Sequence, residues 1–202
     1  MTLILREAFK KLYEAALCPG DPTEVQSYIS AVWIKYQIAH YLQPSSIVEL
    51  GVRAGYSSWA MRIGCPTAKI TGIDSFVSGN QGSYGHEEQL KANAERLFKQ
   101  IDATLVCADT QTLEAFPKAE LYHVDADHNV KSAYNDITFC LRANPGAVVI
   151  VHDANHRDVI GAALQALQHF DFRMSIQRID SHWGDAVIAK SPQKWVGSVI
   201  PF

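Results

Sequence analysis

The sequence predicts an α/β fold in which a mostly parallel, seven-stranded sheet carries helices on both faces and ends in an antiparallel hairpin. Short apolar runs alternate with stretches of helical period from residue 46 onward, which is typical of parallel strands joined by crossover helices. The last two runs, 172–179 and 185–188, are separated by a loop too short for a crossover, so they form the hairpin. With 202 residues, 48% of them hydrophobic and 19% charged, the chain can build one domain with a substantial core.

Two helices are expected before the first strand. Apolar side chains recur at a roughly helical spacing over residues 2–17, and a turn rich in Pro and Gly follows. Thr23 is expected to cap a second helix, which Pro44 ends. These helices are an addition to the alternating pattern that begins after them.

We therefore treat 1–202 as a single domain, with an N-terminal helical addition at 1–43 and a core at 45–190. The sequence leaves three roles open for the addition. It covers a substrate, it forms a contact in a homodimer, or it completes the packing of the core.

A glycine turn follows the first strand of the core. Glu49 lies near the end of that strand, Gly51 and Gly55 bracket the turn, and Ser57 or Ser58 can cap the helix that follows. A turn without Cβ atoms lets a ligand approach the backbone closely. The helix start then offers unpaired N–H groups and a partial positive charge to an anionic group. Strand, turn and helix together form the ligand-binding corner of an open α/β sheet.

The next strand, 69–74, ends on an acid. An acid at this place, 25 residues after Glu49, can hydrogen-bond both hydroxyls of a ribose, although Asp74 can also cap the loop that follows. The spacing E-x-G-x-x-x-G differs from the dinucleotide fingerprint G-x-G-x-x-G, so the pattern favours a nucleoside other than a nicotinamide dinucleotide.

The run from Glu49 to Gly55 resembles the first motif of the class I S-adenosylmethionine-dependent methyltransferases. The sheet of that family is Rossmann-like and seven-stranded, with an antiparallel pair at its end. The resemblance covers roughly residues 45–190. It implies a cofactor site made of Glu49, Gly51, Gly55, Tyr56, Ser57, Asp74, Ser75, Asp109 and Asp125.

The loop 75–85 and Asp109 are also expected to lie beside this site. The loop 75–85 contains three glycines and two aromatic residues, which favours a lid over the ligand, the alternative being an idle surface loop. Strands are expected at 104–107 and 121–125, with the helix 86–100 before the first of them. Asp109 resembles the family's adenine-contacting position, but it can equally cap a short helical turn.

Acids and imidazoles cluster after two predicted central strands, 121–125 and 147–151. Since the carboxyl ends of these strands meet at one edge of the sheet, the side chains are expected to converge there. Polar groups gathered at such an edge cost stability, which favours a functional role. The two clusters are Asp125, Asp127 and His128, and His152, Asp153, Asn155 and His156.

These clusters resemble the branch of the family that is similar to catechol and caffeoyl-CoA O-methyltransferases, and to small methyltransferases with Asp-x-Asp-His and His-Asp segments. In the metal-dependent catechol type, an acid after the fourth strand and an Asp-Asn pair after the fifth hold a divalent ion. Asp125 and Asp153 match the two acids, whereas Ala154 stands in place of the Asn. Asn155 or His152 can supply a third ligand, and His would favour a transition metal over Mg²⁺.

The resemblance implies methyl transfer from S-adenosylmethionine, most simply to a hydroxyl of a small molecule. The expected catalytic residues are Asp125, His128 and Asp153, and the expected metal ligands are Asp125, Asp153 and Asn155. In a metal-free alternative, His128 takes the substrate proton while an acid orients its ring. Two other functions stay open at this point, namely an S-adenosylmethionine-binding protein without transfer activity and a nicotinamide-dependent oxidoreductase.

Composition limits the partners. A formal net charge of −3 gives no overall basic surface for nucleic acid, which favours a small-molecule substrate. Four scattered cysteines form no C-x-x-C pair, and the charged N-terminal residues do not resemble a signal peptide. No apolar run is long enough to span a membrane, so we expect a cytoplasmic protein.

Overall fold

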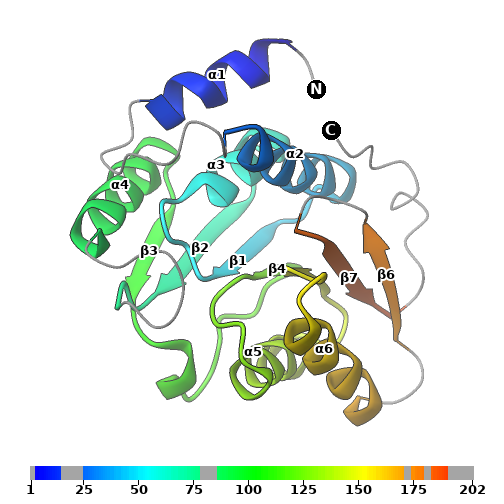
Figure 1. Cartoon of the computed structure of the whole chain (residues 1–202). Coiled ribbons are helices and arrows are strands. Elements are labelled where there is room, and N and C mark those ends of the chain that lie inside the picture. The colour runs from blue at the N-terminus through cyan, green and yellow to red at the C-terminus, as the bar shows by residue number, and fades with distance from the viewer. Residues whose placement is uncertain (1–2, 15–24, 78–85, 171–173, 180–182, 191–202) are drawn as a thin grey trace.

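The computed structural model describes residues 3–14, 25–77, 86–170, 174–179 and 183–190 of the chain. Seven strands form one sheet in the order β3-β2-β1-β4-β5-β7-β6 (Figure 1). Strands β1 to β5 run parallel, and β7 pairs antiparallel with both β5 and β6, which confirms the predicted sheet. The strands are β1 (Ser46–Leu50), β2 (Lys69–Asp74), β3 (Thr104–Cys107), β4 (Leu121–Val124), β5 (Val148–His152), β6 (Ser175–Ile179) and β7 (Asp185–Ala189).

Helices cover both faces of the sheet (Figure 1). On one face lie α1 (Leu3–Glu14), α2 (Val25–Leu42), α3 (Tyr56–Gly64) and α4 (Glu87–Gln100), and on the other lie α5 (Val130–Ala143) and α6 (Arg157–His169). A short 3-10 turn, η2 (Thr110–Thr112), follows β3. The connections from β1 to β2, from β2 to β3 and from β4 to β5 each contain an α-helix, whereas the connection from β3 to β4 contains only η2.

Side chains of the central strands divide between two apolar layers. In β1, Val48 and Leu50 pack in the core beneath α5 and α6, whereas Ile47 packs in the core beneath α2 and α3. Strands β4 and β5 are buried along their whole length because helices cover both of their faces. Polar residues in these strands are therefore exceptional and need partners.

The order of the strands reverses between β1 and β4. Strand β1 pairs with β2 on one side and with β4 on the other, so the segments that follow these strands diverge at their carboxyl ends. Open α/β sheets bind ligands in the crevice at this point. The glycine turn and both clusters of acids and imidazoles lie at this edge.

The N-terminal helices are packed into the fold. Phe9 of α1 is fully buried, with its ring 5.4 Å from that of Tyr56 and 6.1 Å from that of Trp59. From α2, Ile34 and Ile38 are fully buried in the same core as Met61 of α3. The helical addition therefore completes the packing of the core on this face. This is the third of the three roles that the sequence left open.

The observed elements begin and end close to the predicted ones. The fifth strand is shifted by one residue, because it runs from Val148 to His152 where 147–151 was expected. This shift places His152 inside the sheet, opposite Asp185 of β7. The expected cap Thr23, most of the loop 75–85 and residues 171–173 and 180–182 lie outside the described residues.

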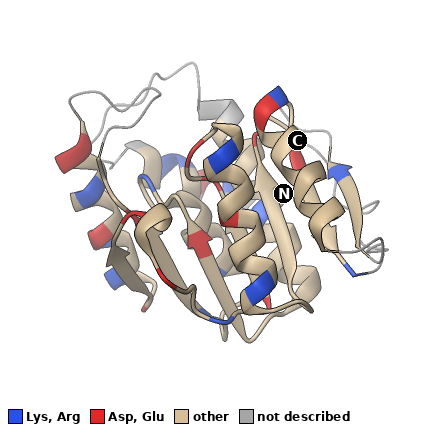
Figure 2. Cartoon of the chain, turned by 90° about the horizontal axis from the view of Figure 1, so that it is seen from below, with Lys and Arg blue, Asp and Glu red and all other residues tan. Residues whose placement is uncertain are grey.

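Charged residues are interspersed on the described surface. Figure 2 shows Lys and Arg scattered among Asp and Glu in this view, with no single basic stretch along the helices that it displays. Within the described parts of the chain, no helix combines the length and the apolar character needed to cross a membrane.

Candidate active site

The turn after β1 is in close contact with the backbone that follows β4. Gly51 has a φ of +83°, and a Cβ at this position would lie 2.1 Å from the carbonyl oxygen of Asp125. Gly55 has a φ of 87° and is the N-cap residue of α3. Because L side chains rarely adopt such φ values, both glycines of the motif are required by the backbone. The predicted glycine turn is confirmed.

The expected serine cap of α3 is wrong. The helix begins at Tyr56, before Ser57 and Ser58, and its N-cap Gly55 makes no side-chain cap hydrogen bond. Ser58 is fully buried instead, and its hydroxyl donates a hydrogen bond to the carboxyl group of Glu49. Because the N-cap residue has no side chain that could accept a hydrogen bond, backbone N–H groups at the start of α3 can donate to an anionic group.

Glu49 is buried at the end of β1, where it contacts α3 and β4. Its side chain is 1% exposed, contacts Ser58, and lies 2.9 Å from Nδ1 of His123 in β4. Burial raises the pKa of Glu49 to about 8, and burial together with the charge of Lys35 lowers the pKa of His123 to about 3. Both shifts favour the uncharged forms of this pair, which joins β1, β4 and α3. Direct contact of Glu49 with a cofactor stays a prediction.

Asp74 ties the glycine turn to the end of β2. One carboxylate oxygen accepts the backbone N–H of Arg53 at 2.7 Å, and the other accepts that of Phe76 at 2.7 Å. Ser75 follows, and its hydroxyl oxygen accepts the N–H of Val77 at 3.3 Å. Asp74 thus does hold its own loop, and each carboxylate oxygen keeps acceptor capacity for a ribose hydroxyl.

Asp109 caps the short turn η2. Its Oδ1 accepts the backbone N–H of Gln111 at 2.9 Å, which confirms the capping alternative. The side chain is otherwise exposed at the carboxyl end of β3. Contact of Asp109 with an adenine ring stays a prediction.

Asp125, His152 and Asp153 form a group at the carboxyl ends of β4 and β5. One ligand atom from each residue lies within 4.8 Å of the other two. The predicted convergence of Asp125 and Asp153 is therefore confirmed. Asp153 has a φ of 54°, a left-handed conformation that is uncommon outside glycine and that often marks functional turns.

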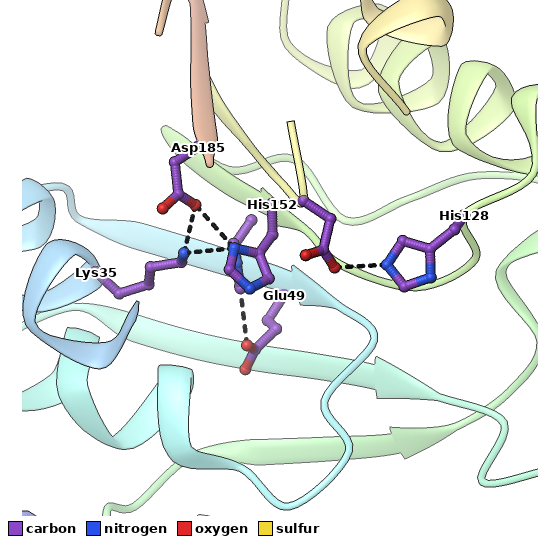
Figure 3. A network of polar contacts seen from close by, with 7 residues as sticks. Lys35, Glu49, His128, His152 and Asp185 are labelled. Atoms are coloured by element: carbon purple, nitrogen blue, oxygen red, sulfur yellow. Dashed lines mark hydrogen bonds and ion pairs between the residues drawn. The ribbon is translucent and has the colours of Figure 1, made fainter. Parts of the chain in front are cut away.

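A His–Asp pair borders this group (Figure 3). Nε2 of His128 lies 2.6 Å from Oδ2 of Asp153. This hydrogen bond raises the pKa of His128 although burial opposes it. Burial alone would raise the pKa of Asp153, but the hydrogen bond from His128 and the nearby His152 lower it. The pKa of Asp125 is raised, chiefly by burial, so the two acids differ in their affinity for a proton.

A buried ion pair lies on the other side of His152 (Figure 3). Lys35 of α2 contacts Asp185 of β7, and both side chains are 0% exposed. Nδ1 of His152 lies 3.0 Å from Nζ of Lys35 and 3.0 Å from Oδ1 of Asp185. Burial and Lys35 act to lower the pKa of His152, but Asp125 and Asp185 outweigh them and raise it.

Asn155 contacts β6 through its side chain. Its side-chain oxygen accepts a hydrogen bond from Arg178 of β6 at 2.5 Å, and the residue is exposed. His152, which the sequence offered as an alternative third ligand, lies beside the two acids, and ligation of a metal by Asn155 stays a prediction. His156 is also exposed, at the N-cap of α6, with its ring 5.9 Å from that of His128.

Lys35 and Asp185 were missed by the sequence analysis. One signal was available for Lys35, since it is the single Lys, Arg, Asp or Glu in the otherwise neutral segment Val25–Leu42. Asp185 carries no comparable signal, because an acid at the start of a strand after a turn is common.

Aromatic residues flank the group on the side of α2. The ring of Trp183, just before β7, meets that of His152 edge-on at 5.7 Å and that of Tyr28 at 5.3 Å. Tyr28 also binds the glycine turn, because Nη1 of Arg53 donates to its hydroxyl at 2.6 Å. The second helix of the N-terminal addition therefore borders the site.

Comparison with known proteins agrees with this geometry. A family model for a methyltransferase domain matches residues 48–154, more than half of the chain. None of the curated proteins compared with the sequence matches it significantly.

Solved structures share the fold at low sequence identity. An O-methyltransferase from Bacillus cereus in complex with SAH has a TM-score of 0.61 at 14% identity, with 93% of this chain and 91% of that chain covered. The O-methyltransferase TomG from Streptomyces achromogenes, in complex with SAM, has a TM-score of 0.58 at 16% identity, with 91% and 89% covered. Cofactor-bound Rv0187 from MTB has a TM-score of 0.60 at 16% identity, with 91% and 88% covered.

The matched region contains the glycine turn, the acid that ends β2 and the group at the ends of β4 and β5. Motif, strand order and family model thus point to one conclusion: the chain belongs to the methyltransferase domain family, and with it to the S-adenosylmethionine-dependent methyltransferases.

Proposed function

We propose that the protein transfers a methyl group from S-adenosylmethionine to a hydroxyl of a small-molecule acceptor, with a divalent metal held by Asp125, His152 and Asp153. The observation that carries the proposal is the convergence of these three side chains beside the glycine turn. Two of the solved structures with this fold are O-methyltransferases, which supports oxygen as the methyl acceptor.

The donor set fits a metal of intermediate softness. Ligand atoms bound to one ion at 2.0–2.2 Å lie about 3–4 Å apart, so a group within 4.8 Å needs only a small closing movement. Two carboxylates and an imidazole suit Mn²⁺, Co²⁺ or Zn²⁺ better than Mg²⁺, which prefers oxygen ligands alone. His128, bonded to Asp153, and Asp185, bonded to His152, would be the outer partners that orient the ligands.

The proposed roles of the chain's residues are binding, orientation and proton transfer. The glycine turn and the start of α3 would bind the amino-acid end of the donor, and Asp74 its ribose. A bound metal would orient the acceptor hydroxyl and lower its pKa. In the transfer, the acceptor oxygen forms a bond to the methyl carbon, the carbon–sulfur bond breaks, and the hydroxyl proton passes to a carboxylate or an imidazole of the site.

A metal-free mechanism has an observation of its own. His128 is held by Asp153 at 2.6 Å, which is the arrangement of a general base with an orienting acid. Under this mechanism His128 takes the hydroxyl proton, and Asp125 and Asp153 bind no ion.

Labelled S-adenosylmethionine and a panel of hydroxylated small molecules test the function, with product masses as the readout. The metal mechanism requires that excess EDTA abolishes turnover, that Mn²⁺ restores it, and that Asp153→Ala stays inactive at every metal concentration. The histidine mechanism requires full turnover in EDTA and its loss in His128→Ala. Methylated nitrogen or carbon in place of oxygen would contradict the proposed acceptor.

A further inference from the structure

A buried cation connects the N-terminal addition to the active site. Lys35 is completely buried, although α2 already packs through Ile34 and Ile38, which are equally buried. A buried ion pair contributes little more stability than apolar residues of the same volume, because both charges lose their hydration. Packing alone therefore gives no reason for Lys35 and Asp185 to be charged.

The two charges meet at one nitrogen of His152. Nζ of Lys35 can only donate a hydrogen bond, and the carboxylate of Asp185 can only accept one. Both atoms lie 3.0 Å from the same Nδ1. Nδ1 therefore has a partner whether or not it carries a proton, since it can donate to Asp185 or accept from Lys35.

The contacts of Nδ1 also fix the orientation of the rest of the His152 ring. His152 ends β5, where it stands opposite Asp185 in the antiparallel pair, and the ring of Trp183 contacts it edge-on. Its other nitrogen, Nε2, makes no hydrogen bond to the described residues, while a nitrogen of this ring lies within 4.8 Å of the carboxylates of Asp125 and Asp153. With Nδ1 occupied, Nε2 is the atom left for chemistry at that group.

We propose that Lys35 and Asp185 are positioning residues of the active site: through Nδ1 they hold the His152 ring so that Nε2 serves the Asp125–Asp153 pair. The inference rests on the proposed function because it assigns His152 to that site. It also makes α2 a part of the catalytic apparatus and not only of the core.

Two double variants distinguish the orientation of the His152 ring from the balance of the buried charges. Lys35→Met with Asp185→Asn and Lys35→Met with Asp185→Val both remove the buried charges together, so neither leaves a lone ion in the core. An asparagine at position 185 still offers Nδ1 of His152 a hydrogen-bond partner, whereas a valine there offers none. Thermal unfolding of each variant first shows whether it is folded and gives its Tm.

The main readout is the nitrogen spectrum of the His152 ring in metal-free protein labelled with ¹⁵N-histidine, assigned by its loss in His152→Gln. We expect wild-type shifts in the double variant with asparagine and displaced shifts of both ring nitrogens in the double variant with valine. Asp136→Asn, which changes a buried acid on the other face of the sheet, should leave them in place. Wild-type shifts in both double variants would show that the ion pair is merely structural.

Mn²⁺ binding, followed by the EPR signal of the free ion, tests the site separately. Loss of an outer partner of a metal ligand lowers affinity by about 10–100-fold, so the double variant with valine should bind Mn²⁺ correspondingly more weakly than the one with asparagine. If wild-type protein binds no Mn²⁺ but the ring shifts respond as expected, the metal assignment fails and the positioning role stands.

Discussion

Asp136 shows what a single buried charge does to this protein. It is completely buried in α5, accepts a hydrogen bond from Gln111 at 2.8 Å through Oδ1, and its Oδ2 has no hydrogen-bond partner among the described residues. Burial raises the pKa of Asp136 to about 7. An acid whose pKa is higher in the folded than in the unfolded state favours folding when protonated, and this contribution is lost as the pH rises.

Asp136→Asn should therefore stabilise the protein at high pH. Between the ordinary aspartate pKa of 3.8 and about 7, the carboxyl loses its proton in the unfolded state first, so the stability of the wild type falls with rising pH. At pH 8 the variant should exceed the wild type in free energy of unfolding by up to about 4 kcal/mol, and the difference should vanish near pH 4. Urea unfolding at several pH values measures this. The exposed Asp102→Asn is the control, and an Asp136→Asn effect independent of pH would contradict the argument.

Asp74 is the residue on which cofactor affinity should depend most directly. Asp74→Ala removes a charged acceptor for the ribose hydroxyls, which is worth about 1.5–3 kcal/mol, or roughly 10–100-fold in dissociation constant. It also frees the N–H of Arg53 in the glycine turn, which adds to the loss. Calorimetry with S-adenosylhomocysteine measures the affinity, with the exposed Glu95→Ala as the control. Unchanged affinity of Asp74→Ala would remove Asp74 from the site.

Among the elements, the glycine turn packs closely against the segment that follows β4. A methyl group on Gly51 would meet the backbone of Asp125 and Ala126, which cannot move aside as a flexible side chain could. Gly161 in α6 offers a contrast, because a Cβ built there meets nothing within 4 Å. The two glycines therefore predict opposite effects of the same substitution.

Gly51→Ala should destabilise the fold by about 1–3 kcal/mol, the range for strained backbone positions, and weaken S-adenosylhomocysteine binding at least tenfold. Gly161→Ala should raise stability by about 0.5–1 kcal/mol, because alanine is the better helix former, and should leave binding unchanged. Denaturant unfolding and calorimetry on both variants give the comparison. Equal binding by the two variants would mean that the close contact at Gly51 does not shape the cofactor site.

For the molecule as a whole, cofactor binding should be visible as added stability. The proposed ligand contacts the segments after β1, β2 and β4, so it would join three parts of the sheet that the unfolded chain does not hold together. A ligand at 100 times its dissociation constant adds about 2.7 kcal/mol. For a domain of this size, that corresponds to a rise in Tm of about 5–10 °C.

Differential scanning fluorimetry with S-adenosylhomocysteine tests this directly. NAD⁺ at the same concentration is the control, since the glycine spacing differs from the dinucleotide fingerprint. A larger Tm shift with NAD⁺ than with S-adenosylhomocysteine would contradict the cofactor.

Local sequence pattern was enough to predict the elements and their order. Strands and helices differ in their apolar period, and the short last loop allows only a hairpin, so the seven-stranded sheet follows without knowledge of its packing. Glycine spacing and the acids after β2, β4 and β5 were likewise readable, because parallel strands bring their carboxyl ends to one edge of the sheet. Asp125 and Asp153 were predicted to converge on this ground alone.

The side chains that complete the site depend on contacts between distant segments. Lys35 and Asp185 are 150 residues apart in the sequence. The local sequence around either residue does not predict that the two side chains are in contact. Strand β5 ends one residue later than expected, with His152 in the sheet opposite Asp185, and Asn155 accepts a hydrogen bond from Arg178. Side chains alternate between the faces of a strand, so register decides which residues meet, and register is fixed by the packing of the whole sheet.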